Sequence, residues 1–227
     1  MQERNAPALI AEAIGTFLFF FVGAGSVVLG DYLAGAGPGL LGVALAHGLA
    51  LAVLVSALGP VSGGHFNPAV TLGAWIMGAI TPARAALYVV AQLVGALAAG
   101  LALRAVFADA WQASSIGTPA LGAGITPLVG IGVEAVLTAL LVLVVIGTAV
   151  DPRGPKIGGL AIGLAVAADI LVGGPITGAA MNPARWFGPA VAAGAYADWY
   201  VWWIGPAIGA AVAALVYRFG LAEPRQA

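Results

Sequence analysis

Long apolar runs dominate this sequence and constrain its fold more than any other feature. A membrane-spanning helix needs about 20 such residues. Six runs of roughly this length cover residues 8–29, 41–58, 84–106, 127–150, 157–173 and 199–219. Of the 227 residues 62% are hydrophobic and 7% are charged, which leaves too few polar side chains to cover a soluble domain. We therefore expect an all-α, multi-pass membrane protein surrounded by a lipid bilayer.

Two shorter apolar segments, 68–78 and 183–193, each begin with a proline. Proline is well tolerated at the first position of a helix. A helix of this length rises about 16 Å, which is about half the thickness of the hydrocarbon core. We expect each segment to form a re-entrant half-helix that lies within the bilayer without crossing it.

The two halves of the chain resemble each other, which indicates an internal repeat. The tripeptide Asn-Pro-Ala follows the second span of each half, as Asn67, Pro68, Ala69 and as Asn182, Pro183, Ala184. Each half, about 8–106 and 127–219, has three spans and one half-helix. Because three is odd, the second half should be inverted relative to the first. The half-helices then enter from opposite faces and meet near the midplane.

Two helix N-termini at the midplane would place about half an elementary charge each at that point and repel cations, including hydronium. The amides of Asn67 and Asn182 add hydrogen-bond donors without a titratable group. A water molecule that accepts from them turns its own hydrogens away along the path, which interrupts proton transfer. The glycine-rich approaches 62–66 and 173–178 are expected to run extended with carbonyls turned toward a cavity. This pattern predicts a pore that excludes protons and ions.

Composition excludes several other classes. With no cysteine and two histidines, neither a disulfide, a thiolate metal site nor a three-histidine metal centre can form, and we expect no metal and no cofactor. A net charge of −1 gives no reason to expect nucleic acid. An enzyme is not expected, because no nucleophile with a nearby base is evident. An ion-coupled secondary transporter remains as a rival, since inverted repeats with broken helices occur there too.

Basic residues orient the chain through the positive-inside rule. If the chain crosses six times, six of the eight basic residues lie on one side and Arg104 lies on the other. The six are Arg4, Arg84, Arg153, Lys156, Arg218 and Arg225. We therefore expect both termini in the cytoplasm, and we expect the membrane to be the plasma (inner) membrane. Arg185 lies in the second half-helix and is a candidate for selectivity.

The segments GGHFNPAVT at 63–71 and MNPAR at 181–185 closely resemble the aquaporin, or major intrinsic protein, family, and the resemblance covers essentially the whole chain. It implies a homotetramer in which each protomer is a separate passive pore for water. In this repeat Glu12 and Glu134 are expected to accept hydrogen bonds from loop backbone, a structural role, although intramembrane carboxylates also serve as ion or proton relays. The expected pore-lining residues are Gly63, Gly64, His65, Ala180 and Met181.

The resemblance also implies a selectivity filter, formed by His47, Ile170, Ala179 and Arg185. This set is most similar to that of vacuolar-membrane aquaporins of plants, and it differs from those of strict water channels and of glycerol facilitators. Ile170 frees space where a ring would stand, and the guanidinium of Arg185 stays charged. The resemblance implies passage of water together with small neutral solutes such as ammonia or urea, with a glycerol-type facilitator as the alternative.

Several residues near this filter allow two interpretations. His65 either braces the first loop or selects solutes. Asp169 either lies in the outer vestibule or accepts a bond from loop backbone. Because segment 110–126 has no histidine, Arg185 is expected to be held by backbone carbonyls alone. Trp186 is expected to pack in the outer region, and the tryptophan pair at 202–203 either lies at the membrane interface or packs against the second half-helix.

Overall fold

The computed structural model describes residues 5–155, 157 and 159–222, so Arg4, Lys156 and Arg225 lie outside the described part. The described residues form helices and no strand. Six helices are long and apolar enough to cross a membrane, which confirms the expected all-α membrane fold. They are α1 (Asn5–Tyr32), α2 (Gly39–Ser62), α4 (Pro82–Val106), α5 (Pro127–Val145) with the π-helical turn η2 (Ile146–Val150), α6 (Leu160–Thr177), and α8 (Val201–Val216) with the π-helical turn η3 (Tyr217–Leu221).

The two half-helices begin at the predicted prolines. They are α3 (Pro68–Ile76) and α7 (Pro183–Ala193), and the only other helical element described is a short 3-10 turn, η1 (Ser115–Gly117). In each half-helix the preceding asparagine is the N-cap: the side chains of Asn67 and Asn182 accept hydrogen bonds from backbone N–H groups of the first turn. This cap satisfies donors that a helix start otherwise leaves unpaired.

The prediction that segment 173–178 runs extended is wrong. Helix α6 continues through Pro175 to Thr177 and ends at Gly178, which has a φ of 78°. Helix α2 ends in the same way at Gly63, with a φ of 95°. A proline near the end of a helix removes only one hydrogen bond, whereas a glycine in the left-handed conformation ends the helix. The extended approach to the second half-helix is therefore shorter than predicted.

Close backbone contacts join α1 to α4 and α5 to α8. A Cβ atom added to Gly95 would lie 2.2 Å from the carbonyl oxygen of Ala13, and one added to Gly209 would lie 2.2 Å from that of Ala135. Only glycine permits helices to approach this closely. The corresponding helices of the two halves thus pack in the same way.

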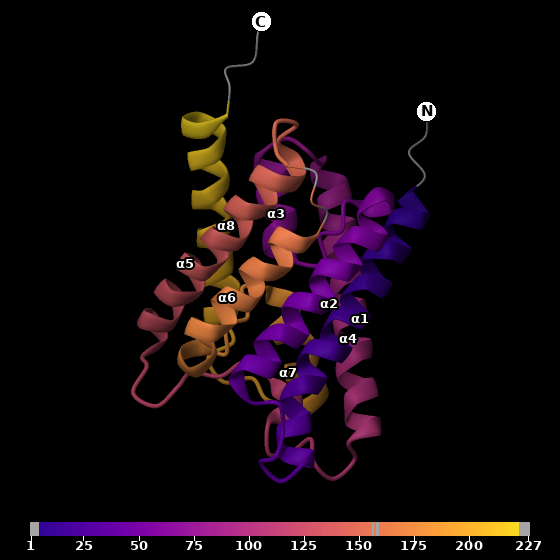
Figure 1. Cartoon of the computed structure of the whole chain (residues 1–227), viewed down its shortest axis with the longest axis vertical. Coiled ribbons are helices and arrows are strands. Elements are labelled where there is room, and N and C mark those ends of the chain that lie inside the picture. Colours follow the sequence, from indigo (N-terminus) through magenta and orange to yellow (C-terminus); the bar gives the residue numbers. More distant parts are fainter. Residues whose placement is uncertain (1–4, 156, 158, 223–227) are drawn as a thin grey trace, which may run out of the picture.

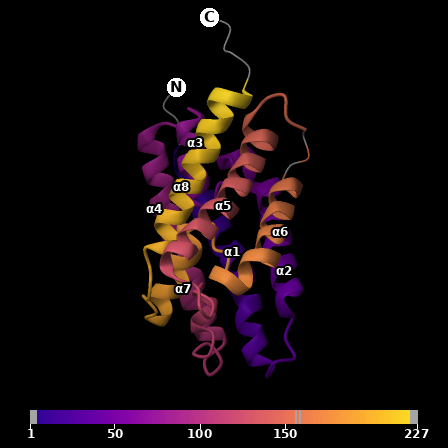
Figure 2. The same ribbon diagram turned by 90° about the vertical axis from the view of Figure 1, so that its left-hand side faces the viewer.

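Figures 1 and 2 show that α1 begins and η3 ends at the same end of the bundle, which we call the terminal end. The connections 33–38 and 107–126 lie at the opposite end, which we call the far end. Helix α3 lies toward the terminal end and α7 toward the far end (Figure 1). An even number of crossings explains why both described ends of the chain share one face.

Candidate functional site

The starts of α3 and α7 meet inside the bundle and are joined by reciprocal hydrogen bonds. Nδ2 of Asn67 donates to the carbonyl oxygen of Met181 at 2.9 Å, and Nδ2 of Asn182 donates to that of Phe66 at 3.0 Å. An amide NH2 group has two hydrogens, so each asparagine retains a second one beyond these bonds. The two asparagines are thus fixed in position by each other's loops.

Glu12 holds the first loop from behind. Its Oε1 accepts from the hydroxyl of Ser62 at 2.7 Å and from the backbone N–H of His65 at 2.9 Å. Its Oε2 accepts from the N–H of Phe66 at 2.7 Å and from Nε2 of Gln92 at 2.8 Å. The side chain is fully buried. A buried carboxylate with four donors is well satisfied and fixes the loop that carries them.

Glu134 holds the second loop in the same manner. Its Oε1 accepts from the hydroxyl of Thr177 at 2.6 Å and from the N–H of Ala180 at 3.0 Å, and its Oε2 accepts from the N–H of Met181 at 2.7 Å. Both glutamates therefore make the backbone contacts expected of a structural role. Neither is among the described residues that line the cavity between the half-helices, so the geometry gives no support to a relay.

The residue before each asparagine has a strained backbone. Phe66 has a φ of 48° and Met181 a φ of 51°. A left-handed conformation at a residue other than glycine costs on the order of 1–3 kcal/mol and persists only where neighbouring contacts enforce it. Here the glutamates bind the N–H groups of these two residues, and the opposite asparagines bind their carbonyls. The strain is therefore part of what orients the asparagine pair.

A narrow cavity, here called the conduit, passes the two asparagines. The predicted lining residues Gly63, Gly64, His65, Ala180 and Met181 lie on it, together with Asn67 and Asn182 and all four predicted filter residues. The prolines and alanines of the two Asn-Pro-Ala motifs do not line it, because they form the buried first turns of the half-helices.

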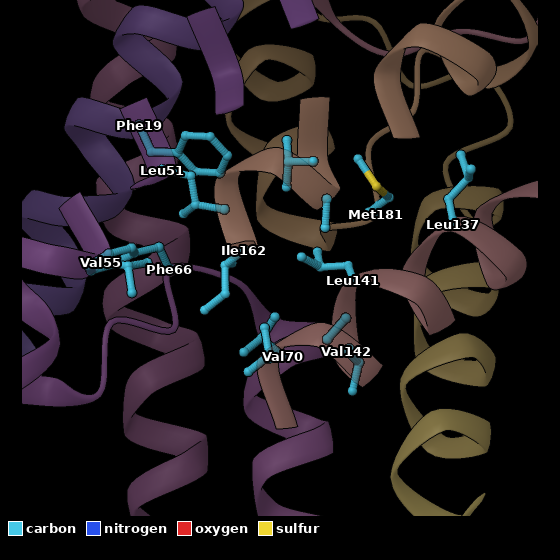
Figure 3. Close-up of a cluster of buried hydrophobic side chains, with 14 of the residues drawn as sticks. Phe19, Leu51, Val55, Phe66, Val70, Leu137, Leu141, Val142, Ile162 and Met181 are labelled. Carbon is cyan, nitrogen blue, oxygen red and sulfur yellow. The ribbon is translucent and has the colours of Figure 1, made fainter. Parts of the chain in front are cut away.

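The apolar wall of the conduit was not predicted from the sequence. This wall consists of Phe19, Leu51, Val70, Leu141, Val145, Ala149, Ile162 and Val166. Figure 3 shows Phe19 and Leu51 close together, with Ile162 among the same group of buried apolar side chains. Along α5 and η2 the wall residues 141, 145 and 149 recur every four positions, as residues on one side of a helix do.

The conduit opens into a wider vestibule at each end. The vestibule at the terminal end has a volume of about 380 Å³ and shares Gly63 and His65 with the conduit, while the one at the far end has about 310 Å³ and shares His47 and Arg185. The conduit itself has a volume of about 30 Å³. Because one water needs about 10–15 Å³ by this measure, the conduit admits only a few waters.

Arg185 occupies the predicted filter and has two partners. Its Nε donates to Nε2 of His47 at 3.1 Å, and its Nη1 donates to the carbonyl oxygen of Gly117 at 2.9 Å. The expectation that backbone carbonyls alone hold this guanidinium is therefore wrong, because one donor binds an imidazole. Since Nε2 of His47 accepts, the ring proton is assigned to Nδ1, which lies 2.9 Å from the carbonyl oxygen of Val43.

The ring of His47 is fixed from behind. A Cβ atom added to Gly23 would lie 2.5 Å from this ring, so α1 approaches it at a point where no side chain fits. The Phe19 ring meets it edge to face at 6.1 Å between centroids. Ile170 and Ala179 complete the wall and present no hydrogen-bonding side-chain atom. The four predicted filter positions thus form a polar side, Arg185 and His47, and an apolar side, Ile170 and Ala179.

The structure gives His65 bracing contacts and also places it on the conduit, while its part in selecting solutes stays a prediction. Its Nδ1 lies 3.0 Å from the hydroxyl of Thr71 on α3, and its ring meets Tyr88 at 5.3 Å between centroids. The same side chain lines the conduit and the vestibule at the terminal end. It therefore braces the first half-helix while it lines the path.

Asp169 meets neither expectation. It is 2% exposed, lies outside the residues that line the far-end vestibule, and its Oδ2 has no hydrogen-bond partner among the described residues. Nothing in the structure explains a carboxylate at this position.

Trp186 is buried and stacks on Trp202, with 5.8 Å between the ring centroids, and Nε1 of Trp202 donates to the carbonyl oxygen of Thr177 at 3.0 Å. Trp202 therefore packs against the second half-helix.

Comparisons with known proteins agree with this architecture. Residues 2–217 match the family described as major intrinsic protein. The chain is 52% identical over 216 residues to "Aquaporin TIP4-4" of Zea mays, covering 92% of this chain and 84% of the relative. It is 46% identical over 228 residues to "Probable aquaporin TIP3-2" of Arabidopsis thaliana, covering 93% and 82%.

Among solved structures, the aquaglyceroporin from Plasmodium falciparum superposes with a TM-score of 0.83 over 96% of this chain and 97% of the other, at 24% identity. This likeness concerns the fold. The family match spans nearly the whole chain, and the relatives share about half of its residues. The chain therefore belongs to the major intrinsic protein family of membrane channels, and it is not an enzyme.

Proposed function

We propose that the protein is a passive channel for water that excludes protons and ions. The observation that carries this proposal is the neutral asparagine pair, held by reciprocal hydrogen bonds on the wall of a conduit that opens at both ends. Among the residues that the structure describes, the side chains along the conduit are apolar, amide, imidazole and one guanidinium, without a carboxylate. The names of the relatives, which include the word aquaporin, support the same function.

The geometry suggests how water passes while protons do not. Each asparagine uses one amide hydrogen to bind the opposite loop, and the other is available to a water in the conduit. A water that accepts from both amides turns its hydrogens toward the two ends. The N-termini of α3 and α7 add positive potential at the same point. A hydrogen-bonded chain of waters then reverses direction at the asparagines and does not carry a proton across.

We further propose that small neutral solutes such as ammonia or urea pass with water. Ile170 and Ala179 occupy little of the filter and make no hydrogen bonds, while Arg185 and His47 form its polar side. A neutral solute exchanges water for the guanidinium N–H groups, whereas a cation is repelled by the charge. The alternative is a glycerol-type facilitator, and a comparison of glycerol influx with urea influx distinguishes the two.

Assembly and placement in the cell belong to the same proposal. We propose a homotetramer with a pore in each protomer, and both termini in the cytoplasm. The plasma membrane predicted from the sequence gains no support from the names of the relatives, and the kind of membrane stays a prediction.

Stopped-flow measurements on proteoliposomes test the proposal. Vesicles that contain the protein should shrink faster than empty vesicles after an osmotic step, and urea, ammonia and glycerol influx should be measured in parallel. Water flux equal to that of empty vesicles, together with solute uptake that needs an ion gradient, would identify a coupled transporter instead. Glycerol influx faster than urea influx would favour the facilitator.

A further inference from the structure

Two arginines outside the conduit occupy equivalent places in the two halves of the chain. Arg104 is in the last turn of α4, and Arg218 lies in η3 just beyond α8. Nη1 of Arg104 donates to the carbonyl oxygen of Ala192 in the last turn of α7 at 2.8 Å. Nη1 of Arg218 donates to that of Ile76, the last residue of α3, at 2.5 Å. Each arginine therefore reaches the C-terminal end of the half-helix that belongs to the other half.

These contacts complement the charges of the half-helices. The last carbonyls of a helix have no partner within it and carry partial negative charge, which a cation stabilises. Neither α3 nor α7 has a basic residue in its own last turn. The cation at each outer end therefore comes from another helix, while the positive end of each half-helix lies beside the asparagines in the conduit.

The contact of Arg104 is the firmer of the two. Its hydrogen bond is partly buried, and its guanidinium lies 4.7 Å from the centre of the Trp111 ring. The hydrogen bond of Arg218 is exposed to solvent, and the nearest ring contact, with Phe219, is at 5.6 Å. Exposed charges are screened by water and salt, so the second contact should contribute less.

Packing beside the two contacts differs in the same direction. A Cβ atom added to Gly188 of α7 would lie 2.2 Å from the carbonyl oxygen of Ala96 in α4. A Cβ atom added to Gly73 of α3 would lie 2.8 Å from Cγ1 of Val142 in α5 but 3.9 Å from the carbonyl oxygen of Ala210 in α8. Helix α7 is thus pressed directly onto the backbone of the helix that carries Arg104, whereas α3 is not pressed onto α8 in this way.

We propose that Arg104 is a positioning residue of the pore. By holding the outer end of α7, it fixes the inner end of the same helix, which carries Asn182 as its cap and Arg185 in its first turn. Arg218 does the same for α3, which carries Asn67 but no filter residue. The inference rests on the proposed channel function and assigns to two residues outside the conduit a part in its selectivity.

The test is the ratio of urea to water permeability in proteoliposomes. Loss of one cation at a helix C-terminus corresponds to about a two- to fivefold change in the equilibrium between the held and the displaced positions of that helix end. Arg104→Gln should therefore raise the ratio of urea to water permeability about two- to fivefold. Arg104→Lys should keep this ratio close to that of the wild type, because the positive charge remains. Arg218→Gln should change the ratio by less than twofold. A matched control is Arg153→Gln, which removes a charge whose hydrogen bonds include those to Asp151 and to the carbonyl oxygen of Leu221.

The ratio separates positioning from mere loss of folded protein, which lowers both permeabilities together and leaves their ratio unchanged. A ratio for Arg104→Gln equal to that of the wild type would overturn the proposal. If that variant does not fold, Trp111→Leu decides instead: it removes the ring beside Arg104, and an unchanged ratio would likewise overturn the proposal. Wild-type protein without water permeability would refute the channel function itself, which is a different outcome.

Discussion

The two re-entrant loops of this channel are built alike, although their residues differ. In the first loop the hydroxyl of Tyr88 donates to the carbonyl oxygen of Ser62 at 2.7 Å, and in the second Nε1 of Trp202 donates to that of Thr177 at 3.0 Å. Ser62 and Thr177 in turn donate to the glutamates that hold the loops. Unlike side chains make the same contact, so the geometry around the asparagines is what both loops share.

The loops differ at the third residue of each half-helix. In α3 this residue is Val70 and in α7 it is Arg185, and both line the conduit. The second loop also meets His47 and Gly117 through that arginine. The shared contacts thus hold the asparagine pair, whereas we attribute selection among solutes to contacts that only the second loop makes.

The largest effect should come from the glutamates, which the two loops share. Glutamine keeps the shape but offers one acceptor oxygen, and each buried donor left unpaired costs about 1–3 kcal/mol. Glu12 accepts from four donors, two on each oxygen, so Glu12→Gln leaves two of them unpaired and should lower the free energy of unfolding by about 2–6 kcal/mol. Glu134 accepts from three donors, so Glu134→Gln leaves one unpaired and should lower it by about 1–3 kcal/mol. Thermal unfolding in detergent measures both, with Asp109→Asn, at an exposed position, as the control. Wild-type melting temperatures for both variants would show that the loops do not depend on these carboxylates.

Replacing Arg185 by valine makes the second loop resemble the first. The change removes the only guanidinium on the described wall of the conduit and two hydrogen bonds from a charged donor, each worth about 1.5–3 kcal/mol. Urea permeability relative to water should rise about 10- to 100-fold. Stopped-flow light scattering checks this, with Arg153→Val as a control outside the conduit. Unchanged selectivity would show that the difference between the loops is not functional.

A double change at the filter tests its apolar side. His47→Phe combined with Ile170→His puts rings on both walls and narrows the opening, so urea and ammonia flux should fall about tenfold more than water flux. The measurement is the set of permeabilities from one vesicle preparation. An equal loss of all fluxes would count against the assignment of these positions to a filter.

The smallest effect should come from Asp151, which lies outside the spans at the terminal end. Hydrogen bonds from Arg153 and Tyr217 hold the pKa of its carboxyl well below the usual range. A lowered pKa in the folded state means that the stabilisation is complete above the unfolded value of about 3.9 and is lost as the pH falls further. The difference in melting temperature between wild type and Asp151→Asn should stay constant from pH 8 to about 5 and shrink below about 4. A difference that disappears near pH 6 would contradict this origin.

Much of the fold was readable from the sequence because the bilayer demands long apolar helices and the motifs repeat. The end of α6 at Thr177 was not, because Gly174 and Pro175 resemble a helix break while the left-handed glycine that ends the helix lies further on. Local sequence did not reveal that Pro175 lies in a last turn.

The filter was readable as a set of positions but not as a set of contacts. That Arg185 binds His47 depends on how α2 and α7 approach each other, which no local pattern encodes. The carbonyl of Gly117, which accepts from the same guanidinium, follows Ile116, whose backbone is left-handed with a φ of 58°. The apolar wall was missed because its residues are indistinguishable by type from those that face lipid.

We propose that the two loops together pass water without protons. Water flux and proton flux measured in the same proteoliposomes, by light scattering and by an entrapped pH-sensitive dye, test this proposal. We expect water flux well above that of empty vesicles and proton flux no greater than theirs. Proton flux that rises with the amount of protein, in step with water flux, would contradict it.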